Sequence, residues 1–94
     1  MNEARLYVDF NEMIESDLVL LSQTDIKIDS LGNSIQLFEG KFVRIYTDDV
    51  NEQGKKDNLI AEGFVELNTH GGWTSVCKWN CRITKDGIRH ESFF

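Results

Sequence analysis

Residues 73–84 read WTSVCKWNCRIT, and this stretch indicates the fold more clearly than any other. Trp73, Cys77, Trp79, Cys81 and Ile83 would share one face with Ser75, and the six residues between them would form the other face. Such alternation with a period of two is typical of a strand that lays one face on a core. We therefore predict one continuous strand over residues 73–84. The Asp-Gly pair at 86–87 favours a tight hairpin, so residues 88–92 are expected to return antiparallel to this strand.

The same period recurs along the rest of the chain. Further strands are predicted over residues 5–10, 17–22, 25–29, 34–38, 41–47 and 59–68, with turn residues between them. Residues 11–16 fit either a helical turn capped by Asn11 or a continued strand. Gly63 interrupts one strand, where a bulge or a sharp bend is the usual reason. The chain contains no proline.

This pattern predicts an all-β fold. The expected architecture is a small antiparallel β-barrel or rolled sheet, SH3-like or OB-like, with seven to eight short strands and at most one helical turn near residues 11–16. An α+β form with that helical turn is the alternative. At 94 residues the chain has room for one domain, spanning 1–94.

The net charge of −6 is unevenly distributed. Residues 1–72 contain 6 Lys/Arg and 14 Asp/Glu, whereas residues 73–94 contain 4 and 2. An acidic surface opposes non-specific attraction to phosphate backbones and anionic lipid. The longest aliphatic run, residues 18–21, is far too short to span a bilayer, and the first residues lack the pattern of a secretory signal. We therefore expect a cytoplasmic protein with no membrane association.

The two cysteines are the residues whose spacing most suggests a disulfide or a metal site. On a continuous strand the Cα atoms of Cys77 and Cys81 would lie about 13 Å apart. That separation is too long for a disulfide or for two thiolates on one zinc ion, so buried free thiols are expected. A site that pairs one cysteine with His70 or His90 is the remaining alternative.

The polar loop at 48–58 begins like a calcium-binding loop. Oxygen-bearing residues occupy its first, third and fifth positions from Asp49, and Gly54 stands at the sixth. Ile60 occupies the position that needs a bidentate glutamate, so a solvated loop is the preferred interpretation. A weak cation site formed by Asp48, Asp49 and Asp57 stays open. No catalytic motif is present, and the sequence predicts neither an enzyme, nor a cofactor, nor a metal site.

Two strands carry more apolar side chains than one core requires. Their second face would hold Phe42, Tyr46, Ile60 and Phe64, opposite in parity to Val43, Ile45, Val65 and Leu67. An apolar outer face needs cover from this chain, a second copy or a partner. The leading hypothesis is therefore a non-enzymatic protein-binding or regulatory domain, or a self-associating one, with the acidic 48–57 loop at the rim. Phe93 and Phe94 could either join this surface or close the core.

A basic carboxyl-terminal segment supports the alternative function. Lys78, Arg82, Lys85 and Arg89 could contact the phosphates of single-stranded nucleic acid. On the predicted strand, however, the tryptophans occupy the face opposite Lys78 and Arg82, so they are more typical of core residues than of stacking platforms. Nucleic-acid binding is therefore the less favoured function.

Overall fold

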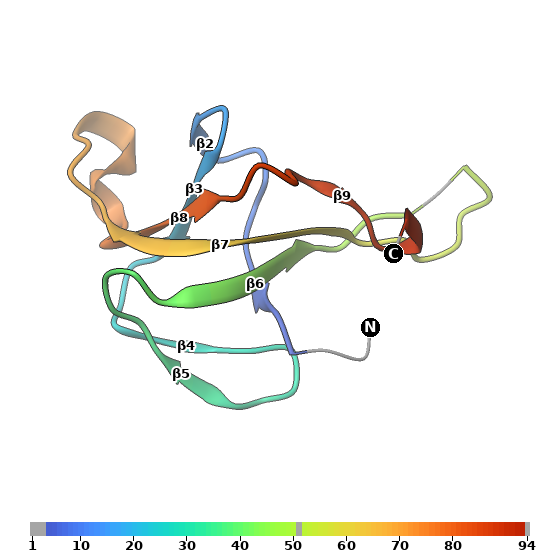
Figure 1. Cartoon of the computed structure of the whole chain (residues 1–94), viewed down its shortest axis with the longest axis horizontal. Coiled ribbons are helices and arrows are strands. Elements are labelled where there is room, and N and C mark those ends of the chain that lie inside the picture. The colour runs from blue at the N-terminus through green and yellow to red at the C-terminus, as the bar shows by residue number, and fades with distance from the viewer. Residues whose placement is uncertain (1–3, 51, 94) are drawn as a thin grey trace.

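The computed structural model describes residues 4–50 and 52–93, apart from the side chains of Trp73 and Phe93. The predicted roles of Phe94 and of those two side chains lie outside the described part. The strands are β1 (Leu6–Tyr7), β2 (Met13–Glu15), β3 (Leu18–Ser22), β4 (Ile26–Ile28), β5 (Ser34–Gln36), β6 (Phe42–Thr47), β7 (Leu59–Leu67), β8 (Trp79–Ile83) and β9 (Arg89–His90), with short 3-10 helices η1 (Gly72–Val76) and η2 (Glu91–Phe93). The all-β prediction is confirmed (Figure 1).

The larger sheet is curled, and its strand order is β1-β6-β7-β8-β3-β2. Its two edges are formed by one segment near the amino terminus. Val8 N–H donates to the Tyr46 carbonyl of β6 at 2.9 Å, and Leu20 N–H of β3 donates to the Glu12 carbonyl at 3.2 Å. The sheet therefore curls far enough for one segment, residues 6–15, to pair with β6 at one end and with β3 at the other.

Of the two alternatives for residues 11–16, the strand forms and the helical turn does not. Met13 instead pairs with Val19 of β3, so the strand ladder satisfies this backbone. The helical turns of the described chain lie at η1 and η2. One pairing departs from the antiparallel prediction, because β1 runs parallel to β6.

A two-stranded hairpin, β4–β5, lies beneath β6 in Figure 1. It forms at the predicted place, with Lys27 opposite Ile35. Ile35 packs on the core cluster of the curled sheet, and Leu37 just after β5 belongs to that cluster. The cluster comprises Leu6, Val8, Val19, Leu21, Leu37, Val43, Ile45, Ala61, Val65, Trp79, Cys81 and Ile83.

The continuous strand predicted over residues 73–84 is wrong in its first half. Helix η1 occupies Gly72–Val76, and β8 begins only at Trp79. Gly72 has a φ of +69°, which turns the chain into η1. The Asn68 amide then donates to the carbonyls of Thr74 at 2.7 Å and Cys77 at 2.9 Å, so the turn is stabilised by a side chain outside it.

The predicted hairpin at Asp86-Gly87 is also wrong. The tight turn exists, with Gly87 N–H donating to the Thr84 carbonyl at 3.0 Å. The following strand β9 does not fold back on β8, however, but pairs antiparallel with β7. β7 is nine residues long, and β8 covers only its second half, so β9 pairs with its uncovered start. β8 and β9 thus lie one after the other along β7, and the turn at Gly87 connects them.

Gly63 causes no bulge. The register of β7 against β6 continues through it without a shift, and the regular pairing with β8 begins at it. Within the described part of the chain, no helix is long and apolar enough to cross a membrane.

Candidate functional site

Two phenylalanine rings are exposed side by side on the outer face of the curled sheet. Phe42 of β6 pairs with Phe64 of β7 in the register, and their ring centroids lie 5.6 Å apart in an edge-to-face arrangement. The rings are 44% and 47% exposed, whereas Val43 and Val65 next to them in the chain point into the core. The parity predicted from the sequence therefore holds at this end of the strands. We call this surface, formed by Phe42 and Phe64, the aromatic face.

The other end of the predicted face is not available to a partner. Ile60 is only 1% exposed, and Tyr46 is half-buried. Ile60 lies between Tyr46 of β6 and Arg89 of β9 in the sheet, and the Tyr46 ring packs against the Tyr7 ring at 5.7 Å. Including Ile60 in an exposed surface was wrong: its cross-strand neighbours on the same face are the large side chains of Tyr46 and Arg89, and it is buried. Burial, followed by the charge of Asp48, raises the pKa of the Tyr46 phenol.

Charged side chains border the aromatic face on its β6 side. Arg44 lies 5.4 Å from the centre of the Phe42 ring, and its Nε atom is 3.2 Å from Glu62. Arg89 approaches the other oxygen of Glu62 at 3.8 Å.

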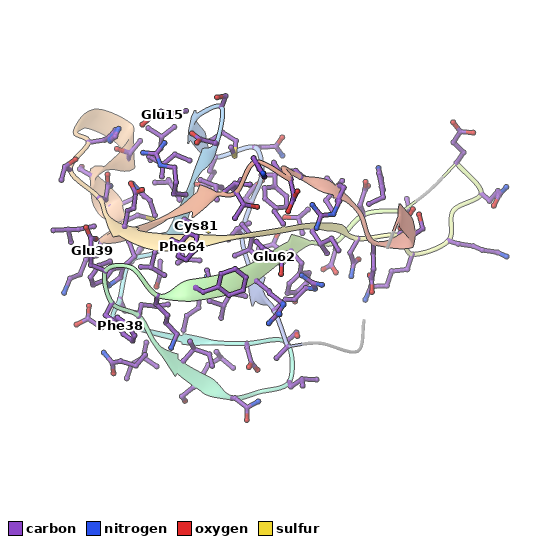
Figure 2. The ribbon with its side chains drawn as sticks, in the orientation of Figure 1. Glu15, Phe38, Glu39, Glu62, Phe64 and Cys81 are labelled. Atoms are coloured by element: carbon purple, nitrogen blue, oxygen red, sulfur yellow. The ribbon has the colours of Figure 1, made fainter. Side chains whose placement is uncertain are left out.

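Figure 2 shows Phe64 and Glu62 along β7, with Phe38 and Glu39 in the turn that precedes β6. Glu39 is tied to the end of β7 by accepting the N–H of Leu67.

Arg82 borders the face on the β8 side, opposite Phe64 in the register. Its guanidinium donates to both oxygens of Glu66 at 3.0 and 3.2 Å, to Asp17 at 2.8 Å and to Glu15 at 3.3 Å. Glu66 is the largest cause, and Glu15 the next, of a raised pKa at Arg82. A bidentate pair of this kind fixes the guanidinium plane. Arg82 therefore holds β8 to β7 and to the β2–β3 turn.

The basic residues proposed for nucleic acid are mostly engaged within the chain. Lys78 Nζ lies 2.7 Å from Asp25, and Arg82 and Arg89 have the acidic partners described above. Lys85 is exposed in the turn between β8 and β9. Three of the four cations thus have carboxylates close by, which weakens their attraction for phosphate.

The two cysteines occupy different environments. Cys81 is completely buried in the core, as predicted, and burial, followed by the charge of Glu66, raises the pKa of its thiol to about 12. Cys77 lies between η1 and β8 and is only half-buried, so its predicted place on the same strand face was wrong. Burial also raises the pKa of the Cys77 thiol.

Carboxylates of the acidic loop at 48–57 form hydrogen bonds and ion pairs with other residues of the chain. Asp57 accepts the N–H and the hydroxyl of Ser92 at 3.0 and 2.9 Å, and its carboxylate lies 3.5 Å from His90 Nδ1. Asp48 is 3.9 Å from Lys56. Among the described residues, no group of three His, Cys, Asp or Glu side chains is arranged to hold a metal ion.

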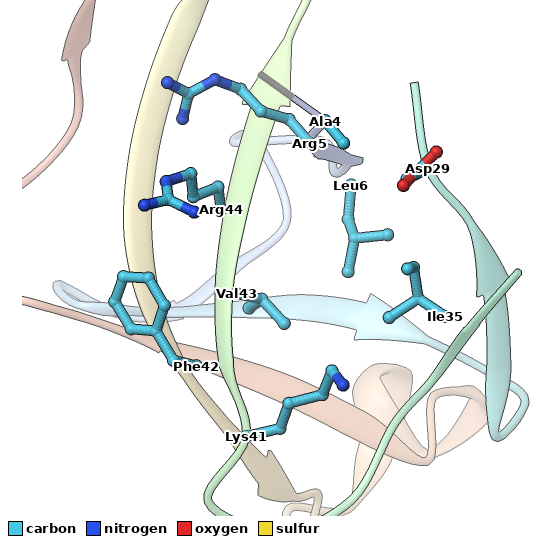
Figure 3. A pocket seen from close by; sticks show the side chains of 9 residues that line it. All are labelled: Ala4, Arg5, Leu6, Asp29, Ile35, Lys41, Phe42, Val43 and Arg44. Carbon is cyan, nitrogen blue, oxygen red and sulfur yellow. The ribbon is translucent and has the colours of Figure 1, made fainter. Parts of the chain in front are cut away.

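The sequence did not reveal a notch beside the edge of β6, with a volume of about 150 Å³. Leu6, Ile35 and Val43 converge in it, and Lys41 reaches toward it, as Figure 3 shows. Ala4, Arg5, Asp29, Phe42 and Arg44 complete its lining. The notch depends on the parallel pairing of β1 with β6, which brings residues far apart in the chain together and leaves no local sequence signal.

The chain matches no protein-family model, no curated protein and no solved structure with which it was compared.

Proposed function

We propose that this chain is a non-enzymatic domain that binds a basic protein partner through the aromatic face. The observation that supports this most directly is the exposure of two paired phenylalanine rings on regular strands. Aromatic and arginine side chains dominate the energetic centres of protein interfaces. Because the rings already pack on each other, little side-chain freedom remains to be lost on binding.

The charge of the chain favours a basic partner over a second copy. Each molecule has a net charge of −6, so two copies repel each other at long range. Glu62 and Glu66 flank Phe64 along β7, and each is bound to an arginine of this chain. These pairs leave the rim of the face locally balanced, so the preference for a basic partner comes from the net charge of the whole chain. The two free cysteines suit the reducing cytoplasm, where we place the protein.

The test uses one variant on the face and one outside it. Phe64→Ser removes an exposed ring from the face, and Val76→Ser removes a 64% exposed side chain from η1. A protein captured from the native extract is purified, and its affinity for each variant is measured by calorimetry. We expect Phe64→Ser to weaken binding by about tenfold or more and Val76→Ser to leave it unchanged, because interface energy is concentrated in central aromatic residues.

Two results would contradict the proposal. One is a purified partner that binds Phe64→Ser as tightly as the unaltered chain. The other is a dimer, measured by light scattering, that Phe64→Ser dissociates, because the face would then be occupied by a second copy.

A further inference from the structure

The hairpin β4–β5 directs a lysine inward and two isoleucines outward. Lys27 lies opposite Ile35 in the register, and Ile35 packs on the core cluster. Ile26 and Ile28, on either side of Lys27 in the chain, are 52% and 56% exposed. Because side chains alternate across a strand, Lys27 occupies the face that turns toward the curled sheet. This placement reverses the usual preference, in which isoleucine is buried and lysine is exposed.

The half-buried Lys27 side chain ends beside a cavity near the end of β3. Its Nζ atom donates to the backbone carbonyl of Leu21 at 2.9 Å, which fixes the end of the side chain. Among the described residues no carboxylate lies within 4 Å of this ammonium, whereas Lys78 contacts Asp25 at 2.7 Å. A partly buried charge without an ionic partner is unfavourable. Positions that break local preferences in this way are expected at functional sites.

The cavity has a volume of about 260 Å³ and lies between the segment after β1, the end of β3 and η1. Val8, Leu21 and Val76 are among its apolar residues, and Asp9 and Glu12 contribute acidic groups. A space of this size holds a molecule of a few heavy atoms rather than a drug-sized ligand. The two carboxylates disfavour an anion, and the ammonium disfavours a cation. The cavity is therefore suited to a small neutral molecule, and none of its lining residues belongs to the aromatic face.

The cavity lining contains two nucleophilic groups, the Lys27 amine and the Cys77 thiol. Burial lowers the pKa of the Lys27 ammonium, against a smaller opposite effect of Cys77, so more of it is free amine at neutral pH than for an exposed lysine. Burial, followed by the charge of Glu12, raises the pKa of the Cys77 thiol. A thiol that keeps its proton is a poor nucleophile. Tyr7 and Asp9 are the other titratable residues of the lining. The amine is therefore the better nucleophile of the two.

We propose that Lys27 is a covalent modification site for small neutral aldehydes, which enter this cavity and condense with its amine. The Nζ lone pair forms a bond to the carbonyl carbon, and the electrons of the C=O double bond move to the oxygen. Transfer of one nitrogen proton to that oxygen gives a carbinolamine. Loss of its hydroxyl group with the second nitrogen proton, as water, leaves an imine. The reaction consumes one amine and one aldehyde and releases one water, so it needs no oxidant or reductant.

The probe is propanal, a neutral aldehyde of three carbons. The full chain is incubated with propanal and sodium cyanoborohydride, which reduces an imine to a stable secondary amine, and each adduct is located by tandem mass spectrometry. Lys85, exposed in the turn between β8 and β9, is the reference within the same chain. At about pH 7 we expect Lys27 to be modified about threefold or more faster than Lys85. At about pH 10.5, where exposed lysines also lose their protons, the ratio should be smaller.

A second probe tests the charge of the cavity. Glyoxylate is an aldehyde of similar size that carries a carboxylate, so the acidic lining should repel it. We expect the preference for Lys27 over Lys85 to be lower with glyoxylate than with propanal, and Glu12→Gln to restore part of it. Cys77→Ser should leave the propanal adduct at Lys27 unchanged, because the thiol takes no part. Retained amide protection in the core of each variant shows that it is folded.

Unfolding the chain in urea provides the control for the fold. The preference for Lys27 should disappear there, because it depends on the cavity and not on the neighbouring sequence. Four results would overturn the proposal: equal rates at Lys27 and Lys85 in the folded chain at about pH 7, an adduct on Cys77 in place of Lys27, the same preference in urea, and an equal preference with glyoxylate.

Discussion

Gly63 of β7 lies directly against the carbonyl oxygen of Arg82 in β8. A Cβ atom added to the glycine would stand 2.3 Å from that oxygen and 2.7 Å from Cys81 Sγ. Both distances are well inside van der Waals contact, and the oxygen belongs to backbone that a rotamer change cannot move. The close approach of these two strands therefore requires glycine at this position.

Gly63→Ala should lower the free energy of unfolding by about 1–3 kcal/mol, the usual cost of overpacking a well-ordered site. The change is measured by urea denaturation. Gly71→Ala is the control, because a Cβ there meets nothing within 4 Å and its φ is −101°. We expect the control to cost less than about 1 kcal/mol. Equal losses in both variants would show that the contact with Arg82 has no special weight.

The burial of Ile60 and the exposure of Phe64 predict opposite responses to mutation. Ile60 is 1% exposed and Phe64 is 47% exposed. Ile60→Ala should cost about 2–5 kcal/mol through lost burial and a cavity. Phe64→Ser should cost only about 1 kcal/mol, because it loses a ring pair at the surface. Urea denaturation measures both. If Phe64→Ser unfolds the domain, the aromatic face is part of the core.

The alternation in the sequence was sufficient to predict the centre of the sheet. The outward direction of the Phe42 and Phe64 side chains follows from parity alone, because both strands keep a period of two without interruption. The burial of the Ile60 side chain does not follow from parity. It depends on Arg89 of β9, which approaches from a distant part of the chain because β7 is longer than β8.

Local pattern also could not separate η1 from a strand. Residues 73–76 were assigned to a strand by extending the alternation of residues 77–83 toward the amino terminus. The backbone there is instead set by Gly72 and by the Asn68 amide, which bonds to Thr74 and Cys77. At Gly87, too, the local sequence predicts the turn but not the strand with which the following residues pair. Its residues predict a tight turn, and one forms, but the direction of the chain beyond it is decided by the unpaired length of β7.

The acidic partners of the basic segment predict that the chain does not bind single-stranded nucleic acid. Lys78 and Arg82 lie within 2.7 and 2.8 Å of carboxylates. Binding a phosphate would require breaking these pairs in a chain of net charge −6. Fluorescence anisotropy with a labelled oligonucleotide at ~50 mM salt should therefore show no binding. Binding that weakens steeply with added salt and is reduced by Lys85→Glu would contradict this expectation.

The buried thiol of Cys81 predicts a loss of stability at alkaline pH. Its pKa is raised from the ordinary value of 9.0 to about 12, chiefly by burial. Between these two values the unfolded chain ionises this thiol while the folded chain keeps it protonated. The contribution is complete below pH 9 and is lost as the pH rises toward 12. The free energy of unfolding should therefore fall by up to about 1.4 kcal/mol per pH unit from this group.

The measurement compares the unaltered chain with Cys81→Ala, in which Cys77 and all tyrosines and lysines remain. Urea denaturation is carried out at several values between about pH 8 and pH 10.5. Cys81→Ala is less stable at neutral pH because it loses core packing, so the pH dependence rather than the absolute stability is compared. The unaltered chain should lose about 2 kcal/mol more than the variant across this range. Parallel curves would show that the Cys81 thiol ionises as readily in the folded chain as in the unfolded one.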